Sequence, residues 1–398
     1  MIGGAERYTL SLGDLLAKHG HDVAYFSTID RGNINTKWNK YFIKKLDFKT
    51  KTFKNSLDKF PKIFYSFEAK KNISKLLDSF KPDIVHLQNI YYYITSSIIN
   101  EIKKRGIPIV QTVHDYQLIN PSVIMFHNGS ICEICKKDNY YKAIFHKCVK
   151  NSYTATLMSV INLYFQNFND YHQKNIDVFI TPSLFMEKKL IEYGFSKSKI
   201  VQINNFLYAS KAASNLRTSG KNVLFYGRIC EAKGIFLILK AAEKLPGISF
   251  KIAGNFEDEE VRSEVYKKIA DTKIENVEIL GFKRDKELDE LIRKSLFVLV
   301  PSLWYENQPY SVLEAFNFGK PVVASKIGGL PELLDSDKNG FLFEPNDVKD
   351  FIQKIQTLLD KPNLAKKFGL NAKKMVESKY DPELHYKSIM ATYNKVII

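Results

Sequence analysis

The feature that most constrains the fold is a regular alternation of short strand-like segments with helical segments along nearly the whole chain. The strand-like segments are rich in β-branched and aromatic residues, and amphipathic stretches separate most of them. This alternation predicts α/β architecture, with parallel sheets covered by helices on both faces. The predicted strands are 22–27, 83–87, 108–113, 177–181, 199–203, 222–226, 249–253, 277–280, 296–300, 322–325 and 341–343; the clearest helices are 5–19, 235–245, 287–294, 310–318 and 348–359.

A polar segment at 208–221 divides the strands into two series, and its small residues are typical of a linker. A chain of 398 residues is also too long for one ordinary core. We therefore expect two Rossmann-like doubly wound domains facing a cleft, at 1–207 and 208–380. A last helix in 381–398 could pack on either domain and is expected on the first. In such sheets ligands bind beyond the carboxyl ends of the strands, so the loops there hold the candidate site residues.

The positive charge is concentrated in the first half. Residues 1–210 carry 29 lysines and arginines against 17 acidic residues, whereas residues 211–398 carry 30 against 26. This asymmetry favours an acidic partner, which could be anionic lipid, a phosphorylated acceptor or nucleic acid. No zinc-finger, RRM or basic-zipper pattern is present, so no nucleic acid is expected. A lysine-rich, well-solvated surface explains the same charge without any partner.

Charged residues follow two predicted strands of the second half. Glu306 lies on the loop after 296–300, and Glu314 lies eight positions later, inside the next helix. The free N–H groups at the start of that helix suit an anion, so Glu306 is expected to face a neutral part of the same ligand, such as sugar hydroxyls. Arg228 and Lys233 follow strand 222–226, where two cations can neutralise a diphosphate.

These residues belong to a longer series of spaced motifs. The series resembles the retaining, nucleotide-sugar-dependent glycosyltransferases of the GT-B fold, often called group 1 glycosyl transferases. The resemblance covers nearly the whole chain and is densest at 222–345. Its motifs are Gly227-Arg228, Lys233-Gly234, Gly254, Gly281-Phe282, Pro301-Ser302, Glu306-x7-Glu314, Gly319-Lys320-Pro321 and Gly328-Gly329-Leu330-Pro331-Glu332.

The resemblance implies a role for each matching residue. Arg228 and Lys233 are expected to bind the donor diphosphate and stabilise the leaving group. Glu306 is expected to orient the donor sugar, and Glu314 to bind the ribose hydroxyls. Phe282 is expected near the base. The resemblance implies neither a metal nor another cofactor, because side chains and helix dipoles replace the cation.

One departure from the family pattern concerns the donor sugar. Many members have glycine three residues after the first glutamate, whereas this chain has Glu306-Asn307-Gln308-Pro309. We expect the backbone at Asn307 and Gln308 to approach the sugar. The departure leaves open which sugar is accepted.

The first half supplies the acceptor side and one catalytic candidate. His86 and His114 both follow predicted strands, where a histidine is more often structural. Family members place a histidine after the second of these strands, facing the donor sugar, so His114 is expected to be catalytic. His86 is expected to be structural, and Asp115 is a weaker candidate for orienting the acceptor.

The chain begins with a glycine turn, Gly3-Gly4, that opens a helix. In the family such a turn follows a strand, and its glycines let the backbone approach donor and acceptor. We therefore expect Gly3 and Gly4 to bind substrate. We also expect the first strand of the N-terminal domain to be missing from this chain, with Met1 an internal methionine.

Three of the four cysteines, Cys132, Cys135 and Cys148, lie close together in the sequence. The first pair has zinc-like spacing, and His127 or His146 would complete a set of four ligands. Relatives with this insertion often have a further cysteine where this chain has Asn120. A reduced structural cluster is the default interpretation, and zinc would be a structural ion, not a catalyst.

We expect a metal-independent glycosyltransferase that moves a sugar from a nucleoside diphosphate donor to a glycan or lipid-linked acceptor, in surface polysaccharide synthesis. A cytoplasmic location is expected, with peripheral contact to an anionic inner membrane through residues 44–81 and 152–172, where aromatic residues accompany lysines. Core packing explains most of these apolar residues equally well. The alternative function is a non-catalytic nucleotide-sugar-binding or partner protein. A dinucleotide-dependent oxidoreductase is disfavoured because Gly3-Gly4 does not complete a G-x-G-x-x-G motif.

Overall fold

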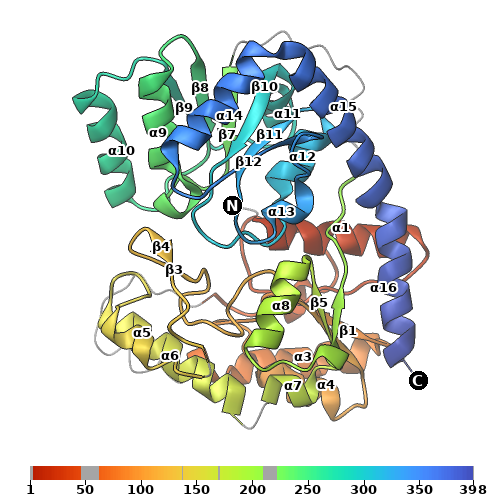
Figure 1. Ribbon diagram of the computed structural model, residues 1–398. Helices are drawn as coiled ribbons and strands as arrows, with labels where there is room; N and C mark the ends of the chain where they lie inside the picture. Colours follow the sequence, from red (N-terminus) through yellow and green to blue (C-terminus); the bar gives the residue numbers. More distant parts are fainter. Residues whose placement is uncertain (1–2, 46–61, 137, 169–170, 209–221, 398) are drawn as a thin grey trace. The chain divides into compact units, whose positions relative to one another are not determined.

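The structure is a computed structural model that describes residues 3–45, 62–136, 138–168, 171–208 and 222–397. The chain forms two compact units (Figure 1). Unit 1 comprises Met1–Ile124, Glu133–Ile203 and Tyr386–Ile398, and unit 2 comprises Met125–Cys132 and Asn204–His385. The sequence predicted a single boundary at 207/208, and most of the linker at 208–221 lies outside the described residues.

Unit 2 contains a six-stranded parallel sheet in the order β12-β11-β10-β7-β8-β9. In chain order this is 3-2-1-4-5-6 read from its β9 edge, the strand order of a Rossmann domain. All six strands were predicted from the sequence, with boundaries within one residue. They are β7 (Asn222–Tyr226), β8 (Ser249–Ala253), β9 (Val277–Gly281), β10 (Ser295–Val300), β11 (Val322–Ser325) and β12 (Gly340–Phe343).

Helices α9–α15 follow these strands, and their apolar faces supply the core. Val312, Leu313 and Phe316 of α12, for example, pack with strand residues such as Val298 and Val322 in one buried cluster. Aspartate caps begin two of the helices, since Asp258 and Asp347 accept hydrogen bonds from the first turn. The helices are α9 (Ile235–Lys244), α10 (Glu259–Asp271), α11 (Asp285–Lys294), α12 (Tyr310–Asn317), α13 (Leu330–Leu333), α14 (Val348–Asp360) and α15 (Pro362–Lys379).

A short antiparallel hairpin also belongs to unit 2, although it comes from the first half of the sequence. It consists of β3 (Phe126–His127) and β4 (Ser130–Ile131), and Ile131 packs against the main core cluster of unit 2. The hairpin was not predicted, because two-residue strands give no periodicity to detect.

Unit 1 contains a four-stranded parallel sheet in the order β1-β2-β5-β6. The strands are β1 (Val85–Leu87), β2 (Ile109–Thr112), β5 (Val178–Thr181) and β6 (Ile200–Gln202). The prediction of one further strand in this unit, at 22–27, is wrong. This segment joins no ladder among the described residues, and only Thr28 beside it forms an isolated bridge, to Ile43. A β-rich composition makes a strand only where a partner edge supplies its hydrogen bonds.

The helices of unit 1 are α1 (Gly4–Lys18), α3 (Phe67–Phe80), α4 (Ser97–Lys103), α5 (Lys142–Phe145), α6 (Tyr153–Asn167), α7 (Tyr171–Asn175), α8 (Leu184–Glu192) and most of α16 (Pro382–Val396). Serine caps begin three of them: Ser66, Ser152 and Ser183 accept from α3, α6 and α8 respectively. Short 3₁₀ turns occur at Asn39–Tyr41, Lys197–Lys199 and Glu231–Lys233.

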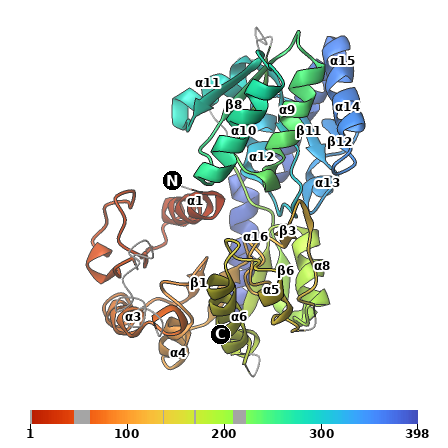
Figure 2. The same ribbon diagram turned by 90° about the vertical axis from the view of Figure 1, so that its left-hand side faces the viewer.

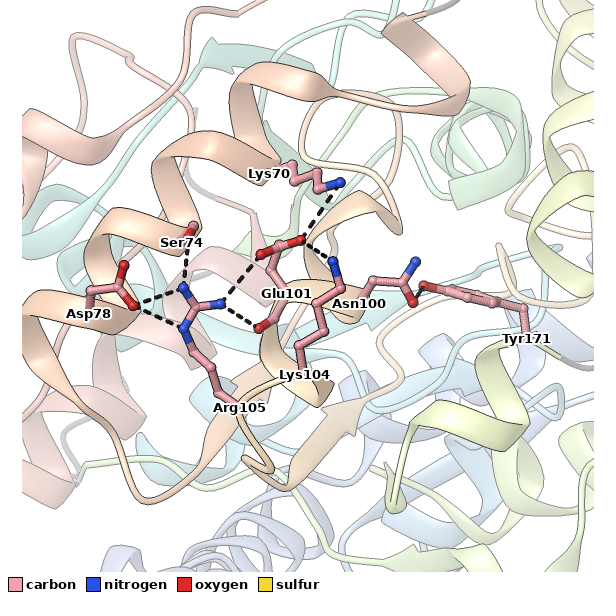
Figure 3. Close-up of polar contacts among 8 residues, drawn as sticks. All are labelled: Lys70, Ser74, Asp78, Asn100, Glu101, Lys104, Arg105 and Tyr171. Carbon is pink, nitrogen blue, oxygen red and sulfur yellow. Dashed lines mark hydrogen bonds and ion pairs between the residues drawn. The ribbon is translucent and has the colours of Figure 1, made fainter.

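A polar network joins α3, α4 and α7 (Figure 3). Arg105 donates to Asp78 and Ser74 of α3 and to the Glu101 carbonyl of α4. Lys70 and Lys104 pair with the buried Glu101 carboxylate. Asn100, the residue before Glu101 in α4, accepts a hydrogen bond from Tyr171 of α7. These contacts hold α3, α4 and α7 together.

Candidate functional site

The candidate site of unit 2 lies at the point where the strand order of its sheet reverses. Strands β7 and β10 are neighbours there, and their connections leave in opposite directions along the sheet. The loops beyond their carboxyl ends therefore diverge and leave a crevice, which is the usual ligand site of an open α/β sheet. Arg228 and Lys233 follow β7 and Glu306 follows β10, so the structure brings these predicted residues together.

Three side chains donate hydrogen bonds to one oxygen of the buried Glu306 carboxylate. Lys233 Nζ lies 2.5 Å from Oε1, Ser302 Oγ lies 2.5 Å away, and Trp304 Nε1 lies 2.8 Å away. Among the described residues no such contact involves Oε2. The carboxylate is thus oriented by one oxygen, and the other can accept hydrogen bonds from a ligand.

The indole of Trp304 also contacts both cations. Lys233 Nζ lies 4.9 Å from the ring centroid, and Arg228 Cζ lies 5.7 Å from it. Arg228 forms an ion pair with Glu257, at 2.8 Å, and both of these side chains are well exposed to solvent. Arg228 can exchange this exposed pair for a ligand at small cost, whereas Lys233 is held at the buried carboxylate.

Burial by itself would raise the pKa of the Glu306 carboxyl. The charge of Lys233 and the hydrogen bonds from Lys233, Ser302 and Trp304 outweigh this effect and hold the pKa below its ordinary value. Glu306 is therefore an ionised hydrogen-bond acceptor at neutral pH, not a proton donor.

Two glycines allow the close backbone packing that positions Glu306 and Lys233. A Cβ on Gly328 would lie 2.3 Å from the Glu306 carbonyl oxygen, and Gly329 N–H donates to that oxygen at 2.7 Å. Gly234, directly after Lys233, has a φ of +77°, and a Cβ there would lie 1.9 Å from the Pro301 carbonyl oxygen. Both positions require glycine for conformational and steric reasons.

The other predicted residues of unit 2 have different surroundings. The buried side chain of Gln308 accepts from Asn205 N–H, at 2.5 Å, and donates to Asn204 Oδ1, at 3.0 Å, so it holds the segment that enters the unit. Asn307 is half-buried, and Glu314 is buried on α12. Phe282, after β9, is exposed. Their contacts with substrate stay predictions.

In unit 1, His114 follows β2 and is held by two side chains. Its Nε2 lies 2.6 Å from Gln88 Oε1, and the ring of Tyr8 from α1 packs edge-on against it at 5.1 Å. Desolvation lowers the pKa of His114 to about 4, so the imidazole is neutral near pH 7. Asp115 accepts from Gln117 N–H and from Asn89, and burial raises its pKa to about 6.

His86 has a structural environment. Its two ring nitrogens lie 2.7 Å from Tyr393 Oη of α16 and 2.7 Å from Thr112 Oγ1 of β2. Gly3 and Gly4 are at the start of α1, where Glu6 accepts from Gly3 N–H at 3.0 Å. This contact caps the helix. The contact of the two glycines with substrate stays a prediction.

The described residues contain no group of three or more His, Cys, Asp or Glu side chains placed to hold an ion, so the zinc alternative for the cysteines finds no support there. Cys135 is buried in a cluster with Tyr140, Ala143 and Leu163, and Cys148 packs against this cluster. The cysteines of unit 1 thus have a packing role.

Trp304 was not predicted as a site residue from the sequence, and Ser302 was predicted only as part of the Pro301-Ser302 motif, with no role of its own. Both lie on the loop that carries Glu306, two and four positions before it. A hydroxyl and an indole N–H lie so near a predicted functional carboxylate in the sequence that both could have been predicted to donate to it. Gln88 and Tyr8, which hold His114, are distant in sequence and gave no such signal.

The site combines a buried carboxylate with two cations, at the point where the strand order of a Rossmann sheet reverses. These features are typical of an α/β protein that binds a polar, anionic ligand. Comparison with known proteins then gives the family. Residues 2–210 match Glycosyltransferase Family 4, and residues 209–375 match Glycosyl transferases group 1. The chain belongs to this family of group 1 glycosyltransferases with the GT-B fold.

Individual relatives agree with this assignment. An uncharacterized 42.6 kDa protein in the cps region of Klebsiella pneumoniae is 27% identical over 88% of this chain and 87% of its own length. The crystal structure of a glycosyltransferase from Rickettsia africae has a TM-score of 0.70 at 18% identity and covers 99% of this chain and 95% of its own. Anabaena HepE, solved in complex with UDP-glucose, has a TM-score of 0.65 at 18% identity over 99% and 97%. At such identity the two structures show the fold alone.

Proposed function

We propose that this glycosyltransferase is a retaining, metal-independent enzyme that transfers a sugar from a nucleoside diphosphate sugar to a glycan or lipid-linked acceptor in surface polysaccharide synthesis. The observation that carries the proposal is the arrangement around Glu306. A buried, ionised carboxylate with one committed oxygen lies beside two cations, which matches a ligand that joins a sugar to a diphosphate. The UDP-glucose complex of HepE and the cps region of the Klebsiella relative support the donor class and the pathway.

In the proposed reaction the cations act on the leaving group. Arg228 and Lys233 bind the diphosphate and stabilise the negative charge that grows on it as the bond to the anomeric carbon breaks. Glu306 Oε2 accepts hydrogen bonds from donor sugar hydroxyls. These hydrogen bonds fix the sugar ring in position relative to the diphosphate.

The acceptor oxygen attacks the anomeric carbon from the face that the diphosphate leaves. A new C–O bond forms, the bond from the anomeric carbon to the phosphate oxygen breaks, and the acceptor proton passes to that departing oxygen. Neutral His114 is proposed to face the donor sugar, and Asp115 to orient the acceptor. Glu314 is proposed to bind the ribose and Phe282 to lie near the base. The backbone at Asn307, Gln308, Gly3 and Gly4 is proposed to approach the substrates.

The test begins with thermal denaturation of the full chain in the presence of a panel of nucleotide sugars. A ligand that binds only the folded state raises the melting temperature. Transfer to acceptor extracts is then measured with the most stabilising donor. We expect Glu306→Ala to fold normally and to lose transfer, with Glu287→Ala on the exposed surface of α11 as the control. Wild-type turnover in Glu306→Ala would refute the assigned role.

The same experiment separates the alternative, a non-catalytic protein that binds nucleotide sugar. Stabilisation by a donor without hydrolysis of that donor or transfer to any acceptor extract would favour this alternative. All the motif residues of the second half are present in the sequence, which argues for catalysis.

A further inference from the structure

Unit 1 contains a pocket of about 300 Å³ that the proposed reaction does not use. Helices α5 and α6 lie side by side (Figures 1 and 2), and Tyr164 near the end of α6 donates to the Asp138 carbonyl in the turn before α5, at 2.7 Å. The volume is at the lower end for small-molecule sites, so it suits a ligand of one or two rings. We call it the α6–α7 pocket, and its lining residues lie within 138–140, 164–168, 173 and 193–195.

One wall of the α6–α7 pocket lies at the amino edge of the unit 1 sheet. Gln173 comes five residues before β5 and Phe195 five residues before β6, and both strands run parallel to β2. His114 and Asp115 instead follow β2, at the carboxyl edge. Strand β5 has four residues, which corresponds to a length of about 13 Å. This wall is therefore at the opposite edge of the sheet from the candidate acceptor residues.

Aromatic rings form most of the pocket, since five of its nine lining residues are tyrosine or phenylalanine. Tyr140 and Tyr164 meet edge to face, with their ring centroids 5.0 Å apart. The buried Phe195 packs edge-on against Phe179 of β5 at 5.2 Å, so the core holds this part of the wall. Phe168 is 70% exposed and thus lies at the rim. Such rings present flat apolar faces to a ligand.

Three polar side chains of the pocket keep hydrogen-bonding capacity. Tyr140 donates to Asp138 Oδ1 at 2.7 Å, and Asn167 Nδ2 donates to Tyr140 Oη at 3.1 Å and to a backbone carbonyl. Gln173 Oε1 accepts from Ser196 N–H at 3.2 Å. Within the described ranges no hydrogen bond involves Asp138 Oδ2, Asn167 Oδ1 or Gln173 Nε2. The pocket therefore combines fixed walls with two acceptors and one donor for a ligand.

The charges at the pocket disfavour an anionic ligand. No lysine or arginine among the described residues lines it, so a phosphate would find no cation there. Lys199, close to one wall, donates to the carbonyl oxygens of Gln173 and Ile176. The exposed carboxylate of Asp138 would repel an anion. The ligand is therefore neutral or cationic.

Hydrogen bonding distinguishes between these two classes. A quaternary ammonium group suits aromatic rings and a carboxylate, but it would leave the N–H groups of Gln173 without an acceptor. A sugar hydroxyl both donates and accepts, so neighbouring hydroxyls satisfy the two acceptors and the donor together. The C–H faces of the same sugar ring pack against the aromatic side chains. A neutral sugar thus uses every group that the pocket offers.

Lipid fits the pocket less well. An acyl chain would leave Asp138, Asn167 and Gln173 in contact with an apolar group and without hydrogen bonds. The membrane contact predicted from the sequence for 152–172, which includes part of this pocket, stays a prediction. In the described part of the chain, no helix is long and apolar enough to cross a membrane.

We propose that the α6–α7 pocket is a second carbohydrate site, which binds a neutral sugar unit away from the place of transfer. The rings of Tyr140, Phe168 and Phe195 pack against the sugar, and Asn167 and Gln173 bind its hydroxyls. A polysaccharide acceptor has many such units, so one unit held here would raise the effective concentration of the chain end at the site of transfer. This consequence rests on the proposed function, whereas the binding of a sugar does not.

The test is saturation-transfer NMR of the full chain, titrated with the methyl glycosides of glucose, galactose and N-acetylglucosamine, with lactose, and with choline. We expect at least one neutral sugar to bind and choline not to bind. Because a sugar can also enter the acceptor side, variants locate the binding. Phe168→Ala removes the ring at the rim and should weaken sugar binding about tenfold. Its matched control is Phe145→Ala on α5, which is 75% exposed, does not line the pocket and should bind as the wild type does.

Two polar variants test the hydrogen bonds. Gln173→Glu replaces the N–H donor but keeps an oxygen for Ser196 N–H, and it should weaken sugar binding about fivefold. Gln353→Glu, at an exposed position of α14, is the control. Asp138→Asn should keep sugar binding within about twofold, because a hydroxyl can accept from the new N–H group. The φ of +59° at Asp138 is one that asparagine tolerates.

The proposal is wrong if the wild type binds none of the neutral sugars, or if choline binds in their place. It is also wrong if Phe168→Ala and Gln173→Glu both bind sugar as the wild type does. Donor binding is measured separately, by thermal denaturation with nucleotide sugars. A wild type that binds a neutral sugar in the pocket but no nucleotide sugar would refute the proposed function alone, and the reverse result would refute only the second carbohydrate site.

Discussion

The candidate residues of the two units are held in position by different kinds of contact. In unit 2, backbone contacts at Gly234 and Gly328 lock the loops that carry Lys233 and Glu306. In unit 1, the loop after β2 carries His114, which is held by the side chains of Gln88 and Tyr8. Backbone packing of this kind tolerates no added side chain, whereas side-chain contacts can be replaced. We infer that the donor side is fixed by the fold and that the acceptor side can be adapted by substitution.

The largest expected effect of a single substitution is at Lys233. The change Lys233→Met removes the cation that pairs with Glu306 and that is proposed to stabilise the leaving diphosphate. We expect transfer to fall about 10³-fold, in line with the loss of one preorganised electrostatic contact. Lys240→Met, at an exposed position of α9, is the control. Wild-type turnover in Lys233→Met would show that the electrostatic centre of the site lies elsewhere.

The next prediction compares two glycines with similar backbone conformations, one in each unit. Gly328 has a φ of +60° and Gly20 a φ of +83°, so alanine at either position costs about 1 kcal/mol of backbone strain. Only at Gly328 does the added Cβ meet another backbone, that of Glu306, whereas nothing lies within 4 Å at Gly20. We expect Gly328→Ala to lose about 3 kcal/mol of stability or more, together with donor binding, and Gly20→Ala to lose about 1 kcal/mol. Equal losses in the two melting curves would contradict the backbone lock.

The contrast between the units also explains what the sequence could predict. The six strands of the parallel sheet of unit 2 have clear boundaries and pair with neighbours, and all of them except the edge strand β9 are mostly buried. Local composition and strand pairing therefore agree there. The segment 22–27 has the composition of a strand but joins no ladder among the described residues, because strand formation also depends on which edge is within reach.

The same limit applies to the site. Glu306, Lys233 and Arg228 were predictable, because each follows a strand and belongs to an ordered series of motifs. The hydrogen bonds that Ser302 and Trp304 donate to one Glu306 oxygen could not be predicted, because they depend on how the loop folds back. The role of Gln308 in holding Asn204 and Asn205 joins residues about 100 positions apart, which no local pattern reveals.

A smaller effect is expected from His172, a buried histidine of α7 in unit 1. Neither ring nitrogen has a hydrogen-bond partner among the described residues, and desolvation lowers its pKa to about 4. Between pH 6.5 and 4 the unfolded chain therefore binds a proton that the native state does not, so stability is lost as the pH falls through this window. At pH 5 this histidine alone costs on the order of 1–2 kcal/mol.

The change His172→Leu should remove that part of the acid sensitivity. We expect the difference in melting temperature between pH 7.5 and pH 5 to shrink by a few °C relative to the wild type. His146→Leu, at an exposed histidine, should leave the difference unchanged. His114 and His385, whose pKa values are also lowered to about 4, still make the protein acid-sensitive, while Asp115, with its raised pKa, acts in the opposite direction below about pH 6. An unchanged difference in His172→Leu would mean that its imidazole is solvated in the native state.

The smallest effect tests the side-chain support of His114 directly. Because Gln88 Oε1 accepts from Nε2, the neutral imidazole should carry its proton on Nε2. The change Gln88→Ala removes this acceptor and should cost about 1 kcal/mol of stability. Nitrogen NMR of the imidazole should show the Nε2–H form in the wild type and a mixture of both tautomers in the variant.

The matching change in unit 2 is Ser302→Ala. It removes one donor from Glu306 but leaves Lys233 and Trp304 in place, so the carboxylate should keep its position and donor binding should change little. If Gln88→Ala leaves the tautomer unchanged, the orientation of His114 is set by the fold, as that of Glu306 is, and the proposed difference between the two units does not hold.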